Sequence, residues 1–125
     1  METKTCAYRV KVGGEITSFT TSCTIEKRGG FSKVKLSSDT NGYTFIVGKN
    51  AVTLITEGQT EYSFTLAEGK EQEFVLNASG ATFKALVFCK KLLIDVEGGK
   101  LSVASKYLMN ISGNETQIDF TLTVN

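Results

Sequence analysis

Apolar and polar residues alternate along almost the whole chain. The clearest case runs from Leu86 to Ile111, where two alternating segments are separated by the pair Gly98 and Gly99. Strict alternation is typical of a β-strand with one buried and one solvated face. Paired glycines supply the positive φ angles of a tight hairpin turn. The pattern therefore predicts a long antiparallel hairpin in this half of the chain.

The remaining chain shows the same pattern. Nine or so alternating runs are separated by turn-forming clusters, such as Gly13-Gly14, Gly29-Gly30 and Asn41-Gly42. Turn clusters roughly every 8–12 residues are typical of an all-β sandwich or barrel. We expect one domain over residues 1–125 that forms an antiparallel up-and-down β-barrel of about eight strands. The interior of such a barrel is filled by side chains or holds one small ligand.

The alternation breaks once, within the predicted strand from Leu86 to Val96. Lys90 falls on the same face as the apolar residues on either side of it. Two interpretations are open: Lys90 points into the interior, or a β-bulge at Lys90 and Lys91 changes the phase of the strand. Burying an unpaired ammonium group costs several kcal/mol. The bulge is therefore the favoured interpretation.

Composition excludes several classes of function. The chain contains no histidine, which is the commonest general base and metal ligand. Lys and Arg total 14 and Asp and Glu total 13, so the net charge of +1 lacks the basic excess that is typical of nucleic-acid-binding proteins. We therefore expect a protein that is not an enzyme, with no metal site and no nucleic-acid partner.

The cysteines and the apolar runs bear on localisation. Cys6, Cys23 and Cys89 are far apart and form no C-x-x-C motif. The chain starts without the apolar segment of a secretory signal, and no run has the length of a membrane-spanning helix. Free thiols in such a chain predict a reducing cytoplasm and no association with a membrane.

The second half of the chain, residues 61–124, resembles a known family. The resemblance rests on these motifs: Tyr62-x-Phe64, Glu68-Gly69-Lys70, Lys90-Lys91-Leu92, Gly98-Gly99, and Leu101-x-Val103-x-x-x-Tyr107 followed by Gly113-Asn114. They are similar to those of the YwiB-like proteins, small bacterial proteins of unknown function with a lipocalin-like (calycin-type) β-barrel. The resemblance implies the barrel fold. It implies no metal, no bound cofactor and no established activity, and it transfers no site residue.

Two sets of polar residues could carry chemistry. A pair of carboxylates could act as acid and base if burial raised one pKa, and the candidates are Asp95, Glu97, Glu115 and Asp119. Their alternation with apolar residues favours a solvated surface instead. Cys89 precedes two lysines, which would lower the pKa of its thiol. Without a histidine base, a buried structural thiol is the favoured interpretation.

The aromatic residues are the best remaining functional signal. Six fall on the predicted inner faces: Phe45, Tyr62, Phe64, Phe74, Tyr107 and Phe120. They form either the core, which is the favoured interpretation, or the lining of a cavity for a small apolar or amphipathic ligand, with Lys90 or Tyr107 as the polar contact.

The predicted function is therefore that of a non-enzymatic cytoplasmic barrel that binds a small hydrophobic or amphipathic ligand. The alternative is a ligand-free protein–protein interaction module, which would present strand edges or loops to its partner. An enzyme of unknown type is the third hypothesis.

Overall fold

The computed structural model describes residues 2–125, and all regular structure in them is β-strand. The strands are β1 (Glu2–Val12), β2 (Glu15–Arg28), β3 (Phe31–Ser37), β4 (Asn41–Val47), β5 (Val52–Gly58), β6 (Thr60–Leu66), β7 (Glu71–Ala78), β8 (Ala81–Glu97), β9 (Lys100–Ile111) and β10 (Asn114–Val124). Each strand pairs antiparallel with the next, and β1 pairs with β10. The predicted closed up-and-down barrel is confirmed. No helix in residues 2–125 is long and apolar enough to cross a membrane.

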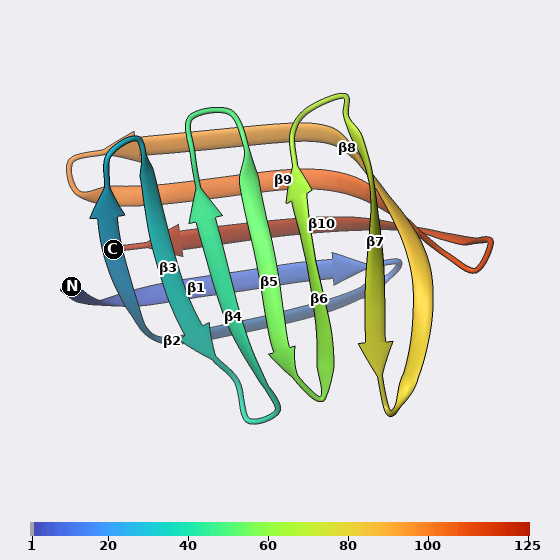
Figure 1. Ribbon diagram of the computed structural model, residues 1–125. Coiled ribbons are helices and arrows are strands. Elements are labelled where there is room, and N and C mark those ends of the chain that lie inside the picture. Colours follow the sequence, from blue (N-terminus) through green and yellow to red (C-terminus); the bar gives the residue numbers. More distant parts are fainter. Residues whose placement is uncertain (1) are drawn as a thin grey trace.

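The barrel has ten strands rather than about eight. Strands β3 to β7 cross over a second group formed by β1, β9, β10 and parts of β2 and β8 (Figure 1). A round barrel of ten strands would have a wider interior than one of eight. The crossing of the two groups flattens this barrel, so side chains still fill it. The expected count was too low, because alternation marks each strand but does not fix how many of them close into one barrel.

Strand β8 bends from one group of strands into the other (Figure 1), and it contains a β-bulge. Cys89 lies opposite Tyr107 and Lys91 lies opposite Lys106, so Lys90 is the extra residue. A bulge increases the bend and twist of a strand locally. The predicted bulge is confirmed, and it lies at the expected pair of lysines.

The bulge changes which residues of β8 face the interior. Alternate residues up to the bulge pack inward, and after it the phase shifts by one, so the inner residues are Ala85, Val87, Cys89, Leu92 and Ile94. Lys90 is exposed, and its Nζ donates a hydrogen bond to Gln117 Oε1 on the outer face at 3.4 Å. The inward orientation of Lys90 as a ligand-lining residue is therefore wrong. The physical reason is that the bulge leaves the ammonium group in water.

The two ends of the interior differ. At the end that contains the β2–β3, β4–β5 and β6–β7 turns, small aliphatic residues are almost fully buried: Val34, Val47, Val52, Leu66, Leu101 and Val124. At the other end, inner apolar residues are only partly buried: Tyr8, Val10, Phe19, Tyr43, Tyr62, Leu76, Met109 and Ile111. The first end is closed by packing, except along the edge of β8, where Leu92 and Ile94 are also partly exposed.

Candidate functional site

All four tyrosines of the chain lie at the second, more open end of the interior, which we call the tyrosine end. They are Tyr8 on β1, Tyr43 on β4, Tyr62 on β6 and Tyr107 on β9. The rings of Tyr8 and Tyr43 are 5.8 Å apart between centroids, although their strands are separated by two others in the sheet. Strands from distant parts of the sequence therefore bring these side chains together.

The six aromatic residues expected on the inner faces all face the interior and contact one another. Phe45 stacks on Phe120 with 6.1 Å between ring centroids, and Phe120 contacts Tyr107 at 6.1 Å. Tyr107 in turn lies 5.6 Å from Phe64, which is 4.9 Å from Phe74. Aromatic pairs at these separations stabilise a core beyond the area that they bury. The four phenylalanine rings of this set therefore fill the middle of the barrel, and Tyr107 connects them to the tyrosine end.

The tyrosine hydroxyls are close enough to influence one another electrostatically. Burial raises the pKa of Tyr8, and the neighbouring Tyr62 and Tyr43 raise it further. Burial also raises the pKa of Tyr107 well above its usual value, with smaller contributions from Tyr8 and Tyr62. The hydroxyls of Tyr8 and Tyr107 are consequently neutral at physiological pH. Each is a hydrogen-bond donor as well as an acceptor.

Thr56 extends this polar group. It is 4% exposed and lies directly between Tyr43 and Tyr62 in the cross-strand register. Burial raises the pKa of Tyr62, while a hydrogen bond with the Thr56 hydroxyl lowers it. No buried side-chain N or O atom of the described residues lacks a hydrogen-bond partner. Each of these hydroxyls is therefore hydrogen-bonded within the protein or reaches solvent.

Tyr8 and Tyr43 were not expected at this site. The sequence feature that could have identified them is their position in the alternation. Tyr8 shares a predicted inner face with Val10, and Tyr43 shares one with Phe45. Sequence alone shows that each tyrosine faces inward. It does not show that the four side chains lie at the same end of the interior, because that depends on which strands lie opposite one another across the flattened barrel.

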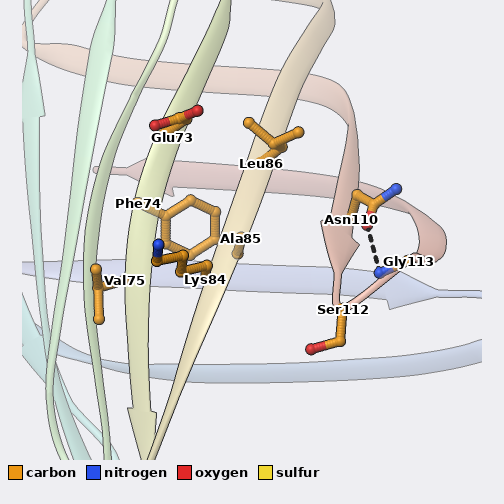
Figure 2. A pocket seen from close by; sticks show the side chains of 9 residues that line it. All are labelled: Glu73, Phe74, Val75, Lys84, Ala85, Leu86, Asn110, Ser112 and Gly113. Carbon is orange, nitrogen blue, oxygen red and sulfur yellow. Dashed lines mark hydrogen bonds between the residues drawn. The ribbon is translucent and has the colours of Figure 1, made fainter.

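A broad groove of about 580 Å³ lies on the outer face (Figure 2). It is lined by residues of β7, β8 and the β9–β10 turn: Glu73, Phe74, Val75, Lys84, Ala85, Leu86, Asn110, Ser112 and Gly113. The turn is held by a hydrogen bond of 3.0 Å from the Gly113 N–H to Asn110 Oδ1. Of the six aromatic residues expected to line a ligand site, Phe74 is the one that borders this groove.

Comparison with known proteins identifies the family. A family model described as a domain of unknown function (DUF1934) matches residues 2–124. The chain belongs to the DUF1934 family. No curated protein sequence matches it.

The fold of this DUF1934 chain is similar to that in the crystal structure of ywiB protein from Bacillus subtilis. The TM-score is 0.80, with 14% sequence identity, over 98% of this chain and 89% of that chain. At this identity the likeness establishes the fold alone. The expected relationship to YwiB-like barrels is confirmed.

The DUF1934 chain does not bring its candidate acid–base residues together. Asp95 and Glu97 lie beside the β8–β9 turn, whereas Glu115 lies beside the β9–β10 turn at the opposite end of the barrel. Within residues 2–125, no group of three or more His, Cys, Asp or Glu side chains is placed to hold a metal ion. The carboxylates are instead surface groups on separate hairpins.

The three cysteines of the DUF1934 chain are free and buried. Burial raises the pKa of Cys6 to about 12, and the adjacent Cys23 thiol contributes to this shift. Burial also raises the pKa of Cys89, although its contact with the Ser105 hydroxyl at 3.7 Å opposes that effect. A thiol must ionise to act as a nucleophile. These positions therefore correspond to structural thiols.

The free energy of unfolding is expected to be flat from about pH 6 to 8 and to fall above about pH 9. The first part follows because the chain has no histidine to titrate in that range. The second follows because the folded-state pKa values of Cys6, Cys23 and Tyr62 are raised. Stability from a raised pKa is present below the unfolded-state value and is lost as pH rises toward the folded-state value.

Urea denaturation at pH 7, 9 and 10.5 checks this expectation. In Cys6→Ala, the fall between pH 9 and 10.5 should be shallower by up to about 1.4 kcal/mol per pH unit, the contribution of one proton. A free energy that stays constant up to pH 10.5 would contradict the prediction.

Proposed function

We propose that this protein is a non-catalytic cytoplasmic binding protein that takes a small amphipathic ligand at the tyrosine end of its barrel. One observation carries the proposal, which is the contrast between the two ends of the interior. One end is closed by almost fully buried aliphatic residues, whereas eight inner apolar residues at the other end stay partly exposed. Folding normally buries such side chains, so a cluster of them at one end of the interior is a favourable place for an apolar ligand.

The chemistry of the tyrosine end defines the ligand. Tyr8, Tyr43 and Tyr62 present apolar rings and hydroxyl groups, and the pKa shifts of Tyr8 and Tyr62 arise from burial and from neighbouring hydroxyls. Such side chains suit a ligand with an apolar body and an uncharged polar group. Phe64 and Phe120 fill the space below them. The ligand would therefore lie at the end of the barrel rather than in its middle.

A binding role accords better with the available side chains than catalysis does. The chain has no histidine, and its cysteine thiols have raised pKa values. A cytoplasmic setting accords with three buried, unpaired thiols. These arguments support the proposal, and the binding experiment tests it.

The test has two parts. Native mass spectrometry of protein purified from its own host, before and after denaturing extraction, should detect a small molecule that is lost on denaturation. Fluorescence titration with N-phenyl-1-naphthylamine, an apolar probe with one polar N–H group, should show binding that Tyr43→Ala weakens about tenfold or more. The matched control is Val75→Ala in the outer groove, which should leave binding unchanged.

Two outcomes would overturn the proposal. One is probe binding that Val75→Ala abolishes and Tyr43→Ala does not, which would place the ligand in the outer groove. The other is a clean apo mass together with no probe binding, which would leave the ligand-free interaction module as the function to pursue.

A further inference from the structure

Strand β8 extends far beyond its partner on one side. It pairs with β7 only from Ala81 to Phe88, whereas its pairing with β9 continues to Glu97. The β6–β7 turn covers the next part of the edge, because the Gly69 N–H donates to the Cys89 carbonyl at 2.8 Å. Beyond the bulge, the segment from Leu92 to Glu97, which we call the β8 edge, has a strand partner on one side only.

One hydrogen bond shows which backbone groups face outward along the β8 edge. The Leu92 N–H donates to Glu68 Oε1 at 3.1 Å, on the side away from β9. Backbone groups of an antiparallel strand point to alternate sides at successive residues. The N–H and C=O groups of Ile94 and Val96 therefore point to the same side as those of Leu92. They are free to pair with another strand.

The β8 edge is also apolar. Leu93 is 59% exposed and Val96 is 58% exposed, and Leu92 and Ile94 are partly buried. Proteins usually protect an edge with a short strand, a proline or inward-pointing charges, because a long apolar edge is a template for pairing. Glu68 covers the first residue alone. A groove of about 300 Å³ lies between the residues Leu92 to Ile94 and the side that carries Lys49, Asn50 and Glu68.

The charges at the ends of the segment identify its partner. Lys91 immediately precedes the β8 edge, and Asp95 and Glu97 lie toward its end. If two copies pair antiparallel about Ile94, Lys91 of one lies opposite Glu97 of the other, and Leu92 lies opposite Val96. In each pairing the two side chains lie on the same face of the sheet. Lys91 and Glu97 are on the outer face, whereas Leu92 and Val96 are on the inner face. The segment is thus complementary to itself.

We propose that the β8 edges of two copies of this chain pair antiparallel about a two-fold axis at Ile94, forming a sheet that runs continuously through the dimer. Such an isologous contact uses the same surface on both subunits. Each copy contributes one Lys91 and one Glu97 to these contacts, so the dimer contains two Lys91–Glu97 pairs. The outward N–H and C=O groups of Ile94 and Val96 then have backbone partners in the second copy, and the Leu92 N–H exchanges its bond to Glu68 Oε1 for one to a Val96 carbonyl.

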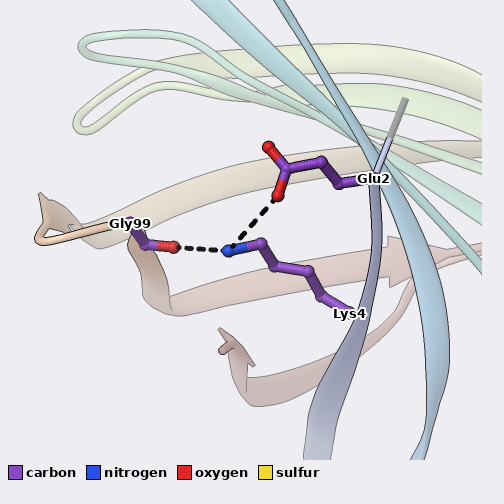
Figure 3. Close-up of polar contacts among 3 residues, drawn as sticks. All are labelled: Glu2, Lys4 and Gly99. Atoms are coloured by element: carbon purple, nitrogen blue, oxygen red, sulfur yellow. Dashed lines mark hydrogen bonds and ion pairs between the residues drawn. The ribbon is translucent and has the colours of Figure 1, made fainter.

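The hairpin that carries the β8 edge is held in place before pairing. Lys4 Nζ, at the start of β1, donates to the Gly99 carbonyl in the β8–β9 turn at 3.2 Å and lies 3.7 Å from Glu2 Oε2 (Figure 3). A preformed edge loses less conformational freedom on association than a mobile one. This contact therefore favours dimerisation without taking part in it.

A second open edge in the barrel lacks these properties. Strand β2 pairs with β3 only from Thr24 to Arg28, so its first half has β1 alone as a partner. That half is rich in Ser and Thr, and between Ile16 and Cys23 it has no charged residue. It offers no complementary charges to a second copy, so the β8 edge is the one we assign to the dimer.

The test is sedimentation velocity of the full chain at concentrations up to about 100 μM, a range in which weak dimers are populated. Lys91→Glu and Glu97→Lys should each weaken the dimer about tenfold or more, because each places like charges opposite one another twice. The double variant K91E/E97K should restore the wild-type dissociation constant. The matched control is Lys84→Glu, the same charge change on β8 away from the edge, which should have no effect.

A backbone variant tests the pairing itself. Val96→Pro removes an N–H that faces the open edge, so it should spare the β8–β9 ladder, keep the far-ultraviolet circular dichroism spectrum and abolish the dimer. A chain that stays monomeric at the highest concentration would overturn the proposal. Two results for a dimer would also overturn it. One is that Lys84→Glu weakens the dimer as much as Lys91→Glu does, and the other is that K91E/E97K does not restore the wild-type dissociation constant.

Discussion

Deletion of Lys106 is expected to leave little or no folded protein, although this lysine is exposed and lies on the outer face. Lys106 lies in the middle of β9, with Leu101 and Val103 buried on one side of it and Tyr107 buried on the other. Removing one residue from a strand turns all the side chains on one side of the deletion to the opposite face. Exposing two or three buried apolar side chains costs roughly 1.5–3 kcal/mol each. The total is comparable to the whole stability of a small domain, about 5–15 kcal/mol.

Deletion of Lys90 is the matched control, since it removes another exposed lysine one strand away. Lys90 is the extra residue of the bulge, so without it Cys89, Lys91 and Leu92 would alternate regularly against Tyr107, Lys106 and Ser105. The inner face would be preserved. The expected loss is about 1–2 kcal/mol for the altered bend and for the hydrogen bond from the Ser105 hydroxyl to the Lys91 carbonyl.

Yield of soluble protein, circular dichroism and urea denaturation of the two deletion variants measure this difference. Equal stability of the two variants would show that Lys90 does not set the phase of β8. If the Lys90 deletion variant fails to fold while the Lys106 deletion variant folds, the role of Lys90 in setting the phase of β8 is likewise contradicted.

Phe120→Ala is expected to lower the free energy of unfolding by about 3–5 kcal/mol, the range for large-to-small changes in a packed core. Phe120 is 2% exposed, and its ring contacts those of Tyr8, Phe45 and Tyr107 at centroid separations of 6.1–6.3 Å. Truncation of Phe120 to alanine removes the contacts of its ring with all three neighbouring rings. The surrounding rings lie on three different strands, which limits how far they can collapse into the space.

Phe31→Ala is the control for this prediction. Phe31 begins β3 and is 41% exposed, so the same substitution should cost about 1 kcal/mol or less. Urea denaturation at pH 7 compares the two variants. A loss of less than about 1 kcal/mol for Phe120→Ala would mean that the aromatic side chains do not form a continuous core.

The two proposed sites lie apart, so their tests are independent. The β8 edge runs toward the β8–β9 turn, whereas the tyrosine end lies toward the β9–β10 turn at the other end of the same hairpin. Ligand binding and pairing of two copies are therefore compatible. Failure of the dimer test would leave the binding proposal intact, and the reverse also holds.

The alternation of side chains determined much of the fold. It marks every strand of the barrel, because burial of one face of a sheet imposes a period of two wherever a strand forms. For the same reason, the single break at Lys90 located the bulge. The absence of histidine is likewise a property of the sequence alone, and it leaves the chain without the commonest general base and metal ligand.

Tertiary structure alone decided how the strands come together. The pairing of Cys6 with Val124 closes the barrel, and the crossing of two groups of strands lets ten of them enclose a filled interior. The same crossing brings Tyr8 against Tyr43 and leaves half of β8 without a second partner. Alternation is a local property of each strand, whereas these features depend on register and strand length across the whole sheet. That is why the inner residues could be predicted from the sequence, and the tyrosine end and the β8 edge could not.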